Sequence, residues 1–425
     1  MTDPALPHVV IIGGGFAGLW AARALADAPV RITLLDRGNH HLFQPLLYQV
    51  ATAGLSAPDI AAPLRHILRK QANVTVLMED VSALDPATRE LRLADGRVIN
   101  FDYALLATGA THAYFGHDDW AEHAPGLKSL DDALDIRRRI LSAFEQAEAS
   151  DDPDARKALL TFAIVGGGPT GVELAGTMAE IARHTLSHEF RRIDPSHSRV
   201  LLLEAGPRVL SSFDPDLSEK ARLQLEKLGV EVLTGMPVAA IDQHGLQVGE
   251  RQIAARTVLW AAGVAASPLA RTLGVPLDRA GRVPVESDLA VPGQPHVFVA
   301  GDLAAVQSDG RPVPGIAPAA KQMGKHVAET IRARLAGKPA KHFQYRDYGN
   351  LATIGRMAAV VQVGRWKLSG AAAWWFWLLA HVFFLIGFRN RLVVMLNWTW
   401  AYWTYQRAAR IILGDPPTDS KDADG

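Results

Sequence analysis

A short apolar run that leads directly into a cluster of glycines constrains this chain more than any other feature. Four β-branched residues at positions 9–12 precede Gly13, Gly15 and Gly18, which have the G-x-G-x-x-G spacing, and an alanine-rich stretch follows. The first glycine permits a tight turn, the second lets a pyrophosphate approach the backbone, and the third lets a helix pack closely on the strand. The pattern of residues 31–35 predicts that they form the next strand, and Asp36 at its end can accept hydrogen bonds from a ribose. The pattern predicts a dinucleotide-binding βαβ unit.

The same pattern occurs a second time. The apolar run 161–165 leads into Gly166, Gly168 and Gly171, and a later strand predicted at 200–203 ends at Glu204. Two complete fingerprints imply two dinucleotides. An acid at the ribose position favours NADH over NADPH because it repels a 2′-phosphate, although Arg208 nearby weakens this preference. The stretch 183–199 before the second strand is basic and unusually long, and we interpret it as an extended helix followed by a loop.

Length and composition restrict the remaining possibilities. A chain of 425 residues predicts two or three domains, and a formal net charge of +0 gives no indication of a nucleic-acid partner. The absence of cysteine excludes disulfides, thiolate metal sites and redox-active cysteine pairs, and we expect no metal site. The first strand is reached by Val9 without a basic region or an apolar signal core, so we expect the protein on the cytoplasmic side of the membrane.

Further apolar runs end in small or polar residues, as strands that approach a cofactor do. Residues 103–106 lead into Thr108 and Gly109, the run 257–264 contains Ala262 and Gly263, and the run 296–299 precedes Asp302. An acid such as Asp302 can accept a hydrogen bond from a ribityl hydroxyl. The helix predicted at 318–327 can direct its N-terminus at a flavin.

Two features permit both a structural and a functional interpretation. Glu173 is predicted in the first turn of the second fingerprint helix, where an acid either complements the helix dipole or lies near the nicotinamide. The segment 39–50 follows neither a helical nor a strand period. It either packs on the first domain or faces the cofactor.

The C-terminal segment has a composition of its own. Residues 348–414 include seven basic residues and no acid, and seven of the ten tryptophans lie between Trp366 and Trp403. The uncharged stretch 368–388 predicts one helix, and 392–413 predicts a second with Arg407 and Arg410 near its end. This composition favours helices that lie in the interface of an anionic membrane. A spanning hairpin and a buried or dimer-forming helix pair are the alternatives. The acidic tail 415–425 is predicted to be disordered.

Taken together, these motifs resemble those of the type II NADH dehydrogenases, which are single-subunit NADH:quinone oxidoreductases that do not pump protons. The resemblance extends from Val9 to about Leu413. Besides the two fingerprints, it is carried by residues 41–49, 107–109, 260–264, 300–302, 351–356 and 387–391.

The resemblance implies an α/β fold with two Rossmann-like units and a C-terminal membrane-associating segment. Residues 1–115 and 265–340 would hold FAD, 116–264 would hold NADH, and 341–414 would dock on the membrane and support a homodimer. The residues expected to contact the cofactors are Gly13, Gly14, Gly15, Phe16, Ala17, Gly18, Asp36, Arg37, Gln44, Thr108, Gly109 and Asp302 for FAD, and Gly166, Gly168, Pro169, Thr170, Gly171, Glu173, Glu204, Ala262 and Gly263 for NADH.

One departure from the family pattern concerns the quinone. The family sequence A-Q-x-x-x-Q is replaced here by one with Pro318 at the first glutamine, while Gln322 keeps the second. Proline cannot donate the amide hydrogen bond of a glutamine, so the identity of the quinone stays open. We expect the quinone near Pro318, Ala319 and Gln322. Lys321 would supply positive charge or a proton.

The reaction implied is hydride transfer from NADH to FAD, followed by two-electron reduction of a quinone at a separate face. Glu173 would hold or poise the nicotinamide, and no proton pumping is expected. Sulfide:quinone oxidoreductases and disulfide reductases share the fold but need cysteines. A reductase of a protein acceptor and a membrane-bound redox sensor of low turnover remain as alternatives.

Overall fold

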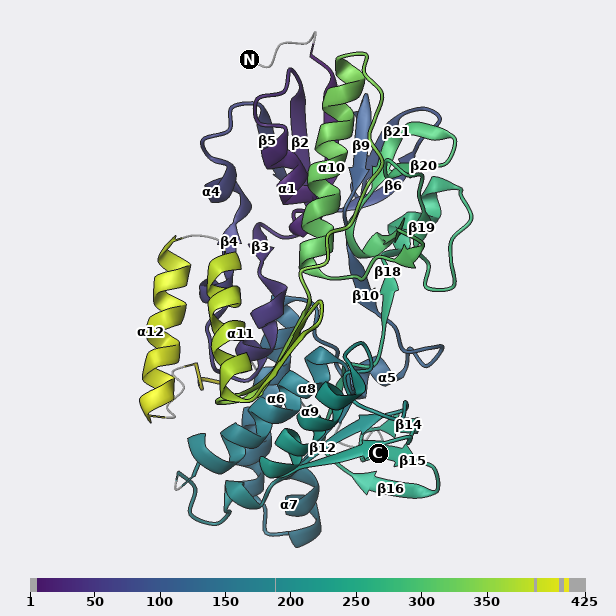
Figure 1. Ribbon diagram of the computed structural model, residues 1–425. Helices are drawn as coiled ribbons and strands as arrows, with labels where there is room; N and C mark the ends of the chain where they lie inside the picture. The colour runs from purple at the N-terminus through teal and green to yellow at the C-terminus, as the bar shows by residue number, and fades with distance from the viewer. Residues whose placement is uncertain (1–5, 188, 386–387, 405–408, 413–425) are drawn as a thin grey trace, which may run out of the picture. The chain divides into compact units, whose positions relative to one another are not determined.

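Two mostly parallel sheets, each with a glycine fingerprint directly after one of its inner strands, form the centres of two structural units (Figure 1). The computed structural model describes residues 6–187, 189–385, 388–404 and 409–412. Unit 1 comprises residues 1–42, 61–111 and 264–348, and unit 2 comprises residues 43–60, 112–263 and 349–425. The tail 415–425, for which disorder was predicted, lies outside the described residues.

The central sheet of unit 1 has the strand order β20-β21-β9-β1-β2-β5. All neighbours pair in parallel except β20, which is antiparallel to β21. The residues of β1 are all buried, as expected for a strand covered on both faces of a parallel sheet. The strands of this sheet are β1 (His8–Ile12), β2 (Arg31–Asp36), β5 (Val74–Met78), β9 (Tyr103–Leu106), β20 (Ala290–Val291) and β21 (Gln294–Val299).

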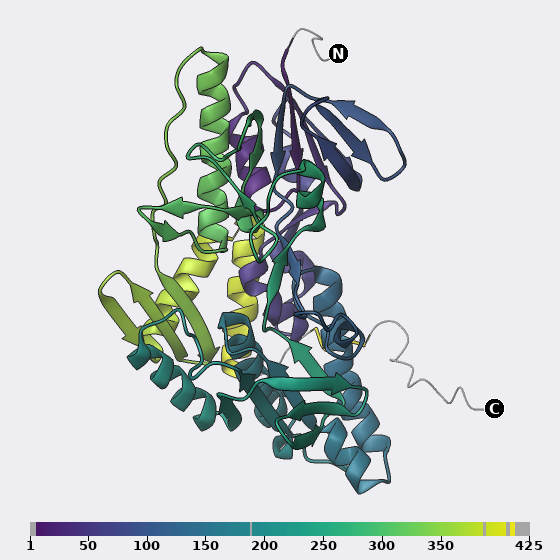
Figure 2. The ribbon, with the colours of Figure 1, turned by 90° about the vertical axis from the view of Figure 1, so that its right-hand side faces the viewer.

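Smaller elements complete unit 1. The antiparallel sheet β6-β7-β8 is drawn in blue in Figure 2, and Gly96 lies in the turn that joins β7 to β8. The strands are β3 (His40–Leu42), β4 (Ala61–Pro63), β6 (Val81–Asp85), β7 (Glu90–Leu93), β8 (Val98–Asn100), β10 (Ala110–His112), β18 (Val264–Ala266), β19 (Val283–Pro284), β22 (Ala304–Ala305), β23 (Gln307–Ser308) and β24 (Arg311–Pro312). The helices are α1 (Phe16–Ala24), α4 (Leu64–Leu68) and α10 (Ala317–Leu335), with 3-10 turns η4 (Pro268–Leu273) and η5 (Gly301–Leu303).

Helices α1 and α10 pack against each other with their backbones in direct contact (Figure 1). A Cβ built on Gly324 of α10 would lie 2.0 Å from the carbonyl oxygen of Ala17 in α1. Only glycine therefore allows this spacing. The packing holds the predicted flavin-facing helix, found here as α10, against the helix of the first fingerprint.

The central sheet of unit 2 has the order β13-β12-β11-β17, with all neighbours parallel. The antiparallel sheet β14-β15-β16 shares a buried core with it. The strands are β11 (Thr161–Val165), β12 (Arg199–Glu204), β13 (Val230–Thr234), β14 (Val238–Asp242), β15 (Gly245–Val248), β16 (Arg251–Ala254) and β17 (Thr257–Trp260). The helices are α2 (Leu47–Ala51), α3 (Ala57–Ile60), α5 (Trp120–His123), α6 (Leu130–Ala149), α7 (Pro153–Leu159), α8 (Pro169–Glu180) and α9 (Pro215–Lys227), with short turns η1 (Gln44–Leu46), η2 (Ile181–Thr185) and η3 (Pro195–His197).

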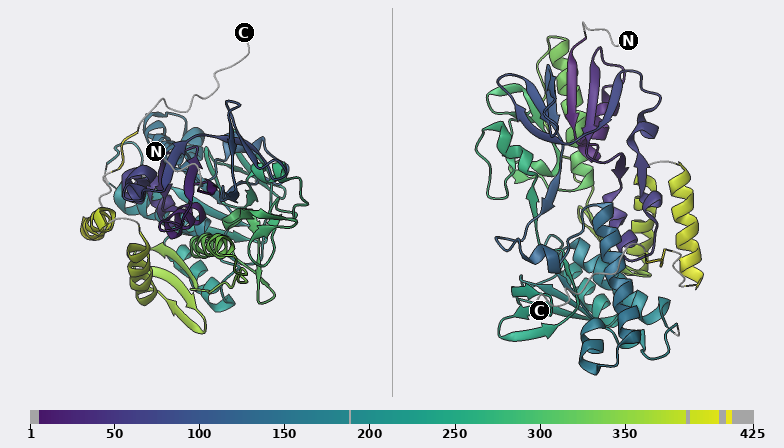
Figure 3. Two further views of the ribbon diagram at one scale, coloured as in Figure 1. Left: turned by 90° about the horizontal axis from the view of Figure 1, so that it is seen from above. Right: turned by 180° about the vertical axis from the view of Figure 1, so that it is seen from behind.

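The C-terminal part of the chain adds a sheet and two helices to unit 2. Strands β25 (Asn350–Gly355), β26 (Ala358–Val363) and β27 (Trp366–Ser369) form an antiparallel sheet, yellow-green in Figure 2, that packs on α8 and α9. A Cβ on Gly176 of α8 would lie 1.6 Å from the Ile354 carbonyl oxygen. Helices α11 (Ala371–Phe384) and α12 (Phe388–Thr404) lie side by side (Figure 3). Among the described helices, none combines the length and apolar character that a membrane crossing needs.

The predicted C-terminal helix boundaries were wrong. Residues 368 and 369 belong to β27, because their backbone pairs with β26, and α11 begins only after Gly370, which has a φ of +70°. Helix α12 ends at Thr404, so Arg410 lies beyond it, and Arg407 is outside the described residues. The sequence of an uncharged run does not show whether the run forms one helix or a strand followed by a helix.

The extended helix followed by a loop, predicted for 183–199, is seen in part, because the helical structure that begins with α8 continues only to Thr185. A π-helical turn, η2, follows α8, and the chain then runs through bends to η3. The Glu148 carboxylate accepts hydrogen bonds from the backbone N–H groups of Arg191 and Arg192 at 2.9 to 3.0 Å. This side chain satisfies donors that a helix would have satisfied internally. Strand β17 ends at Trp260, before the small residues of the run 257–264.

We expect Gly324→Ala to destabilise the protein by about 1 to 2 kcal/mol, because the new methyl group must push α10 away from the Ala17 carbonyl group. The higher helix propensity of alanine offsets part of this loss. Thermal unfolding should show a lowered Tm. Glu329→Ala, at an exposed position of the same helix, is the control and should leave the Tm nearly unchanged. A Tm for Gly324→Ala at or above that of the wild type would contradict the packing argument.

Candidate functional site

The turn after β1 is built so that only glycine fits at its first and third fingerprint positions. Gly13 has a φ of +105°, and a Cβ there would lie 2.4 Å from the Ala107 carbonyl oxygen. A Cβ on Gly18 would lie 1.8 Å from the carbonyl oxygen of Gly13. By contrast, a Cβ on Gly15 would meet no atom within 4 Å. The turn is therefore closed on the side of the sheet and open at the middle position, where a phosphate is expected.

The acid at the end of β2 is hydrogen-bonded to this turn. The Asp36 carboxylate accepts the N–H of Gly14 at 2.6 Å and the N–H of Gly38 at 2.7 Å. A carboxylate has about four acceptor positions, so Asp36 can still accept a ribose hydroxyl. Arg37, next in the chain, is exposed. The acid thus fixes the turn and keeps acceptor capacity for a ligand.

The second fingerprint repeats this geometry. Gly166 has a φ of +111°, and a Cβ on Gly171 would lie 1.8 Å from the Gly166 carbonyl oxygen. The Glu204 carboxylate accepts the N–H groups of Gly167 and Gly206, both at 2.6 Å. A Cβ on Gly168 would meet nothing within 4 Å. Pro169 and Thr170, which begin α8, are exposed beside this open position. The chain therefore carries two turns of the same geometry, each open at the position where a phosphate is expected.

Unit 1 also contains an unsatisfied polar atom next to its fingerprint. The Oγ1 atom of Thr108 is buried and has no hydrogen-bond partner among the described residues. The backbone nitrogen of Thr108 would lie 3.1 Å from a Cβ on Gly13, so this residue adjoins the phosphate turn. The next residue, Gly109, has open space at its Cβ position and a φ of +69°. An unpaired hydroxyl at such a position fits a bound dinucleotide with acceptor oxygens.

Asp302, the acid expected to contact the flavin, lies close to Gly315 in unit 1. A Cβ on Gly315 would lie 3.3 Å from an Asp302 carboxylate oxygen. Asp302 is in η5 and follows Gly301, whose φ is +79°. Gln44, in contrast, begins η1 and clusters with unit 2. The structure thus places Asp302, but not Gln44, in the same unit as the first fingerprint.

Glu173 lies one turn into α8 and not in its first turn, which contains no acid. The predicted position was wrong because α8 begins as early as Pro169. The side chain is buried, and this burial raises the pKa of Glu173 well above its usual value, although a hydrogen bond from the Thr353 backbone opposes the shift. A helix dipole acting on the first turn does not explain an acid at this position.

The residues expected at the quinone lie together in the first two turns of α10. The amide of Gln322 forms two hydrogen bonds of 2.9 Å with the backbone N–H and carbonyl group of Arg346. The Lys321 ammonium nitrogen lies 4.0 Å from the centre of the Trp20 ring. Burial, together with the nearby Lys325 and Arg23, lowers the pKa of Lys321.

The two remaining members of this set differ in exposure. Ala319 is fully buried, whereas Pro318 is partly exposed. Pro318 lies within the first two residues of α10, where the missing N–H of a proline is tolerated. The Gln322 amide therefore uses its hydrogen bonds to hold the backbone of Arg346. The Ala319 side chain has no exposed surface that a ligand could contact.

A histidine that sequence reasoning did not place at the site lies beneath the first fingerprint. The His41 ring is buried, and its Nδ1 atom is 3.0 Å from the Gly14 carbonyl oxygen. Its Nε2 atom has no hydrogen-bond partner among the described residues. The ring meets Phe16 edge-on at 5.0 Å. The only signal for this role in the sequence was the place of His41 at the start of the 41–49 motif.

The rest of that motif packs in unit 2 against the C-terminal helices. Trp398 of α12 donates its indole N–H to the side-chain oxygen of Gln49 at 2.7 Å. His381 of α11 meets Phe43 edge-on at 6.3 Å and lies 4.3 Å from the Trp377 ring. Burial lowers the pKa of His381 to about 4. The 43–50 segment is thus a support for α11 and α12.

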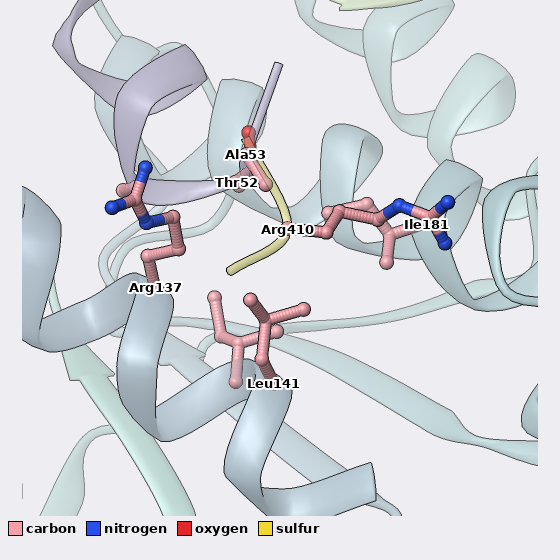
Figure 4. Close-up of a pocket in the computed structure, with 8 residues that line it drawn as sticks. Thr52, Ala53, Arg137, Leu141, Ile181 and Arg410 are labelled. Atoms are coloured by element: carbon pink, nitrogen blue, oxygen red, sulfur yellow. The ribbon is translucent and has the colours of Figure 1, made fainter. Parts of the chain in front are cut away.

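A small hollow in unit 2 has two arginines at its border. It is lined by Ala51, Thr52, Ala53, Arg137, Ile140, Leu141, Ile181 and Arg410. The guanidinium groups of Arg137 and Arg410 point to opposite sides (Figure 4), and Arg410 forms an ion pair with Glu189 at 2.6 Å. The hollow has no room for a water molecule. We assign it no ligand.

The buried His41 predicts a pH dependence of stability. Burial lowers the pKa of His41 to about 4 from 6.5. Between these values the unfolded chain binds a proton that the folded chain does not, so stability is lost as the pH falls from about 6.5 to about 4. His41→Asn keeps a donor for the Gly14 carbonyl group and removes the titration.

Urea unfolding of His41→Asn should show a smaller loss of stability over this pH range than the wild type, by about 3 kcal/mol. Only the change with pH is compared, so a constant offset between the two proteins does not matter. Parallel profiles for the two proteins would contradict the burial of a neutral histidine.

Comparison with known proteins places this geometry in a family. The model of the pyridine nucleotide-disulphide oxidoreductase family matches residues 7–324. The type II NADH:quinone oxidoreductase Ndh of Mycobacterium tuberculosis is 49% identical over 420 residues, which cover 95% of this chain and 90% of that protein. The type II NADH:quinone oxidoreductase of Staphylococcus aureus is 28% identical over 375 residues, which cover 86% of this chain and 92% of that protein.

A solved structure agrees at the level of the fold. NDH2 from Plasmodium falciparum, in complex with NADH, superimposes with a TM-score of 0.87 at 18% identity, covering 96% of this chain and 100% of that chain. The expected α/β dinucleotide-binding flavoprotein fold is confirmed. The chain belongs to the type II NADH:quinone oxidoreductases, within the pyridine nucleotide-disulphide oxidoreductase family.

Proposed function

We propose that this protein is a flavoenzyme that oxidises NADH and reduces a quinone to quinol without pumping protons. The observation that carries the proposal is the 49% identity to a type II NADH:quinone oxidoreductase over nearly the whole chain. The duplicated fingerprints support it, because passing electrons from one dinucleotide to another requires two such sites. A reductase of a protein acceptor or a redox sensor of low turnover is not favoured.

Unit 1 would hold FAD through the turn from Gly13 to Gly18, the carboxylate of Asp36 and the unpaired hydroxyl of Thr108. Bound FAD supplies a two-electron carrier that accepts a hydride from NADH and passes the electrons to a quinone. The N–H groups at the start of α1 would orient the pyrophosphate. His41, by its contact with the Gly14 carbonyl group, would hold this turn in place.

Unit 2 would hold NADH through the turn from Gly166 to Gly171. Glu204, fixed by two backbone N–H groups, would accept the adenosine ribose hydroxyls and repel a 2′-phosphate. The raised pKa of Glu173 means that its buried carboxyl group keeps a proton to a higher pH than an exposed glutamate does. Such a group would contribute a neutral donor on the nicotinamide side.

On the quinone side, Lys321 is the group suited to moving a proton. Its lowered pKa makes release of the proton at Nζ easier than from an exposed lysine, and the Trp20 ring holds the ammonium group by a cation–π contact. Gln322 would act mainly by holding the backbone near Arg346, which its amide already pairs. Pro318 and Ala319 would then shape the quinone site by their backbone.

The C-terminal helices would bind the surface of a membrane at its cytoplasmic face. Large apolar side chains of α11, α12 and the following segment are exposed, and residues 348–414 contain no acid. These side chains are Trp375, Phe376, Leu379, Phe383, Phe384, Leu392, Met395, Leu396, Trp400, Trp403 and Ile411. Such a set matches the apolar face of an interfacial helix. A homodimer formed by the same region stays a prediction.

Steady-state oxidation of NADH and NADPH by the FAD-loaded protein, with and without a soluble quinone analogue, tests the function and the role of Glu204. The wild type should oxidise NADH rapidly only when the quinone is present, and NADPH slowly. Glu204→Ala should raise the NADPH to NADH ratio of kcat/KM by roughly tenfold, because about 1.4 kcal/mol of charge repulsion is removed.

Glu231→Ala removes an acid from the neighbouring strand β13 and is the matched control, which should keep the wild-type ratio. If NADH reduces the flavin and quinone does not reoxidise it, the assignment of the acceptor is wrong. If both variants change the ratio equally, Glu204 has no specific role.

Membrane binding can be tested by sedimentation with vesicles of phosphatidylcholine, with or without half phosphatidylglycerol. The wild type should bind the anionic vesicles more tightly. Replacing Trp400 and Trp403 together by glutamate should weaken this binding by roughly tenfold or more, because it removes two exposed aromatic rings and adds charge. Leu223→Glu changes an exposed leucine of α9 and should bind like the wild type. Unchanged binding of the tryptophan variant would overturn the surface assignment.

A further inference from the structure

Phe115, near the start of the 112–263 part of unit 2, combines an exposed apolar ring with a left-handed backbone. The side chain is 70% exposed, although its ring is large and apolar. Its backbone has a φ of +55°, in the left-handed region, which costs a phenylalanine roughly 1 kcal/mol or more. A strained backbone that presents an exposed ring makes Phe115 a candidate for contact with a ligand, and its surroundings decide which ligand.

The ring is nevertheless held in a defined place. A Cβ built on Gly263 would lie 2.5 Å from the Cζ atom and 2.9 Å from the Cε2 atom of Phe115, so the ring lies directly on this glycine. The backbone N–H of Ala113 donates to the Gly263 carbonyl group at 3.2 Å. The Trp260 indole N–H donates to the Ala113 carbonyl group at 2.9 Å. The 113–115 segment is thus fastened to the carboxyl end of β17.

This end of β17 is where one half of a dinucleotide bound to unit 2 must lie. In the order β13-β12-β11-β17, Glu204 ends β12 on one side of the phosphate turn, and β17 lies on the other side. A Cβ on Gly166 would lie 2.5 Å from the Ala261 carbonyl carbon, so the chain after β17 borders the turn directly. A dinucleotide crosses such a sheet at the reversal of strand order. With its adenosine ribose at Glu204, its nicotinamide half extends over residues 261–263.

We propose that the ring of Phe115 is a binding surface for the nicotinamide half of NADH, and that Gly263 is a glycine because a side chain there would displace this ring. The inference rests on the proposed function, since it assumes that unit 2 binds NADH. An apolar ring at this place gives the flat nicotinamide a face to contact while Glu204 and the phosphate turn hold the other half.

Isothermal titration of the FAD-loaded protein with NAD⁺ and with ADP-ribose tests the proposal. ADP-ribose lacks the nicotinamide, and NAD⁺ binds without reducing the flavin. Phe115→Ala should weaken NAD⁺ binding by roughly tenfold and change the Kd of ADP-ribose by less than about twofold. Phe115→Tyr should keep the wild-type Kd for both ligands. Leu223→Ala, at a leucine of the same unit that is 51% exposed, is the control and should change neither.

A double-mutant cycle with Gly263→Ala tests the pairing. Gly263→Ala should weaken NAD⁺ binding in the wild-type background and have an effect at least about threefold smaller in the Phe115→Ala background, because the ring is then absent and only the Ala113 carbonyl oxygen, 3.0 Å from the new methyl group, stays in close contact. Equal effects of Phe115→Ala on NAD⁺ and ADP-ribose, or no effect on NAD⁺, would overturn the proposal. A wild-type protein that binds neither ligand would overturn the proposed function as well, and binding of both with an unaffected variant would overturn only the role of Phe115.

Discussion

The contact between the first and third glycines of each fingerprint is the constraint on which the rest of the structure depends. In both units a Cβ on the third glycine would lie 1.8 Å from the carbonyl oxygen of the first. The helix can therefore start immediately beside the strand, with its N-terminus at the carboxyl edge of the sheet. Without this contact the N–H groups at the start of α1, and likewise those of α8, would not face the expected phosphate position of their own unit.

The acids of the two sites extend this constraint to the neighbouring strand. Asp36 and Glu204 each accept, at 2.6 Å, the N–H of the residue that follows the first fingerprint glycine (Gly14 and Gly167), and a second N–H two residues beyond the acid. Each turn is therefore tied to the strand on which the ribose is expected. The two units differ in what surrounds this common core. Unit 1 adds Thr108 and His41, whereas unit 2 adds the buried Glu173 and the exposed Phe115.

The C-terminal segment acts on unit 2 in two ways. Its sheet packs on α8 so closely that Gly176 must be a glycine, and a hydrogen bond from the backbone of Thr353 reaches Glu173. Its helices are held by Gln49 and Phe43 from the 41–49 motif. The segment that carries the exposed aromatic side chains is therefore connected to α8 through its own sheet, which packs against both α8 and α11.

The sequence by itself determined the two Rossmann-like units, because their turns depend on glycines and acids at fixed spacing, which local geometry requires. It also indicated Glu173 and the separate character of residues 348–414. Only the tertiary structure decided that residues 366–369 form a strand and that the Gln322 amide is paired with Arg346, because each depends on a partner distant in the chain. The positions of His41 and Phe115 were likewise invisible in the sequence, since burial, exposure and contact with Gly14 or Gly263 arise only when separate segments meet.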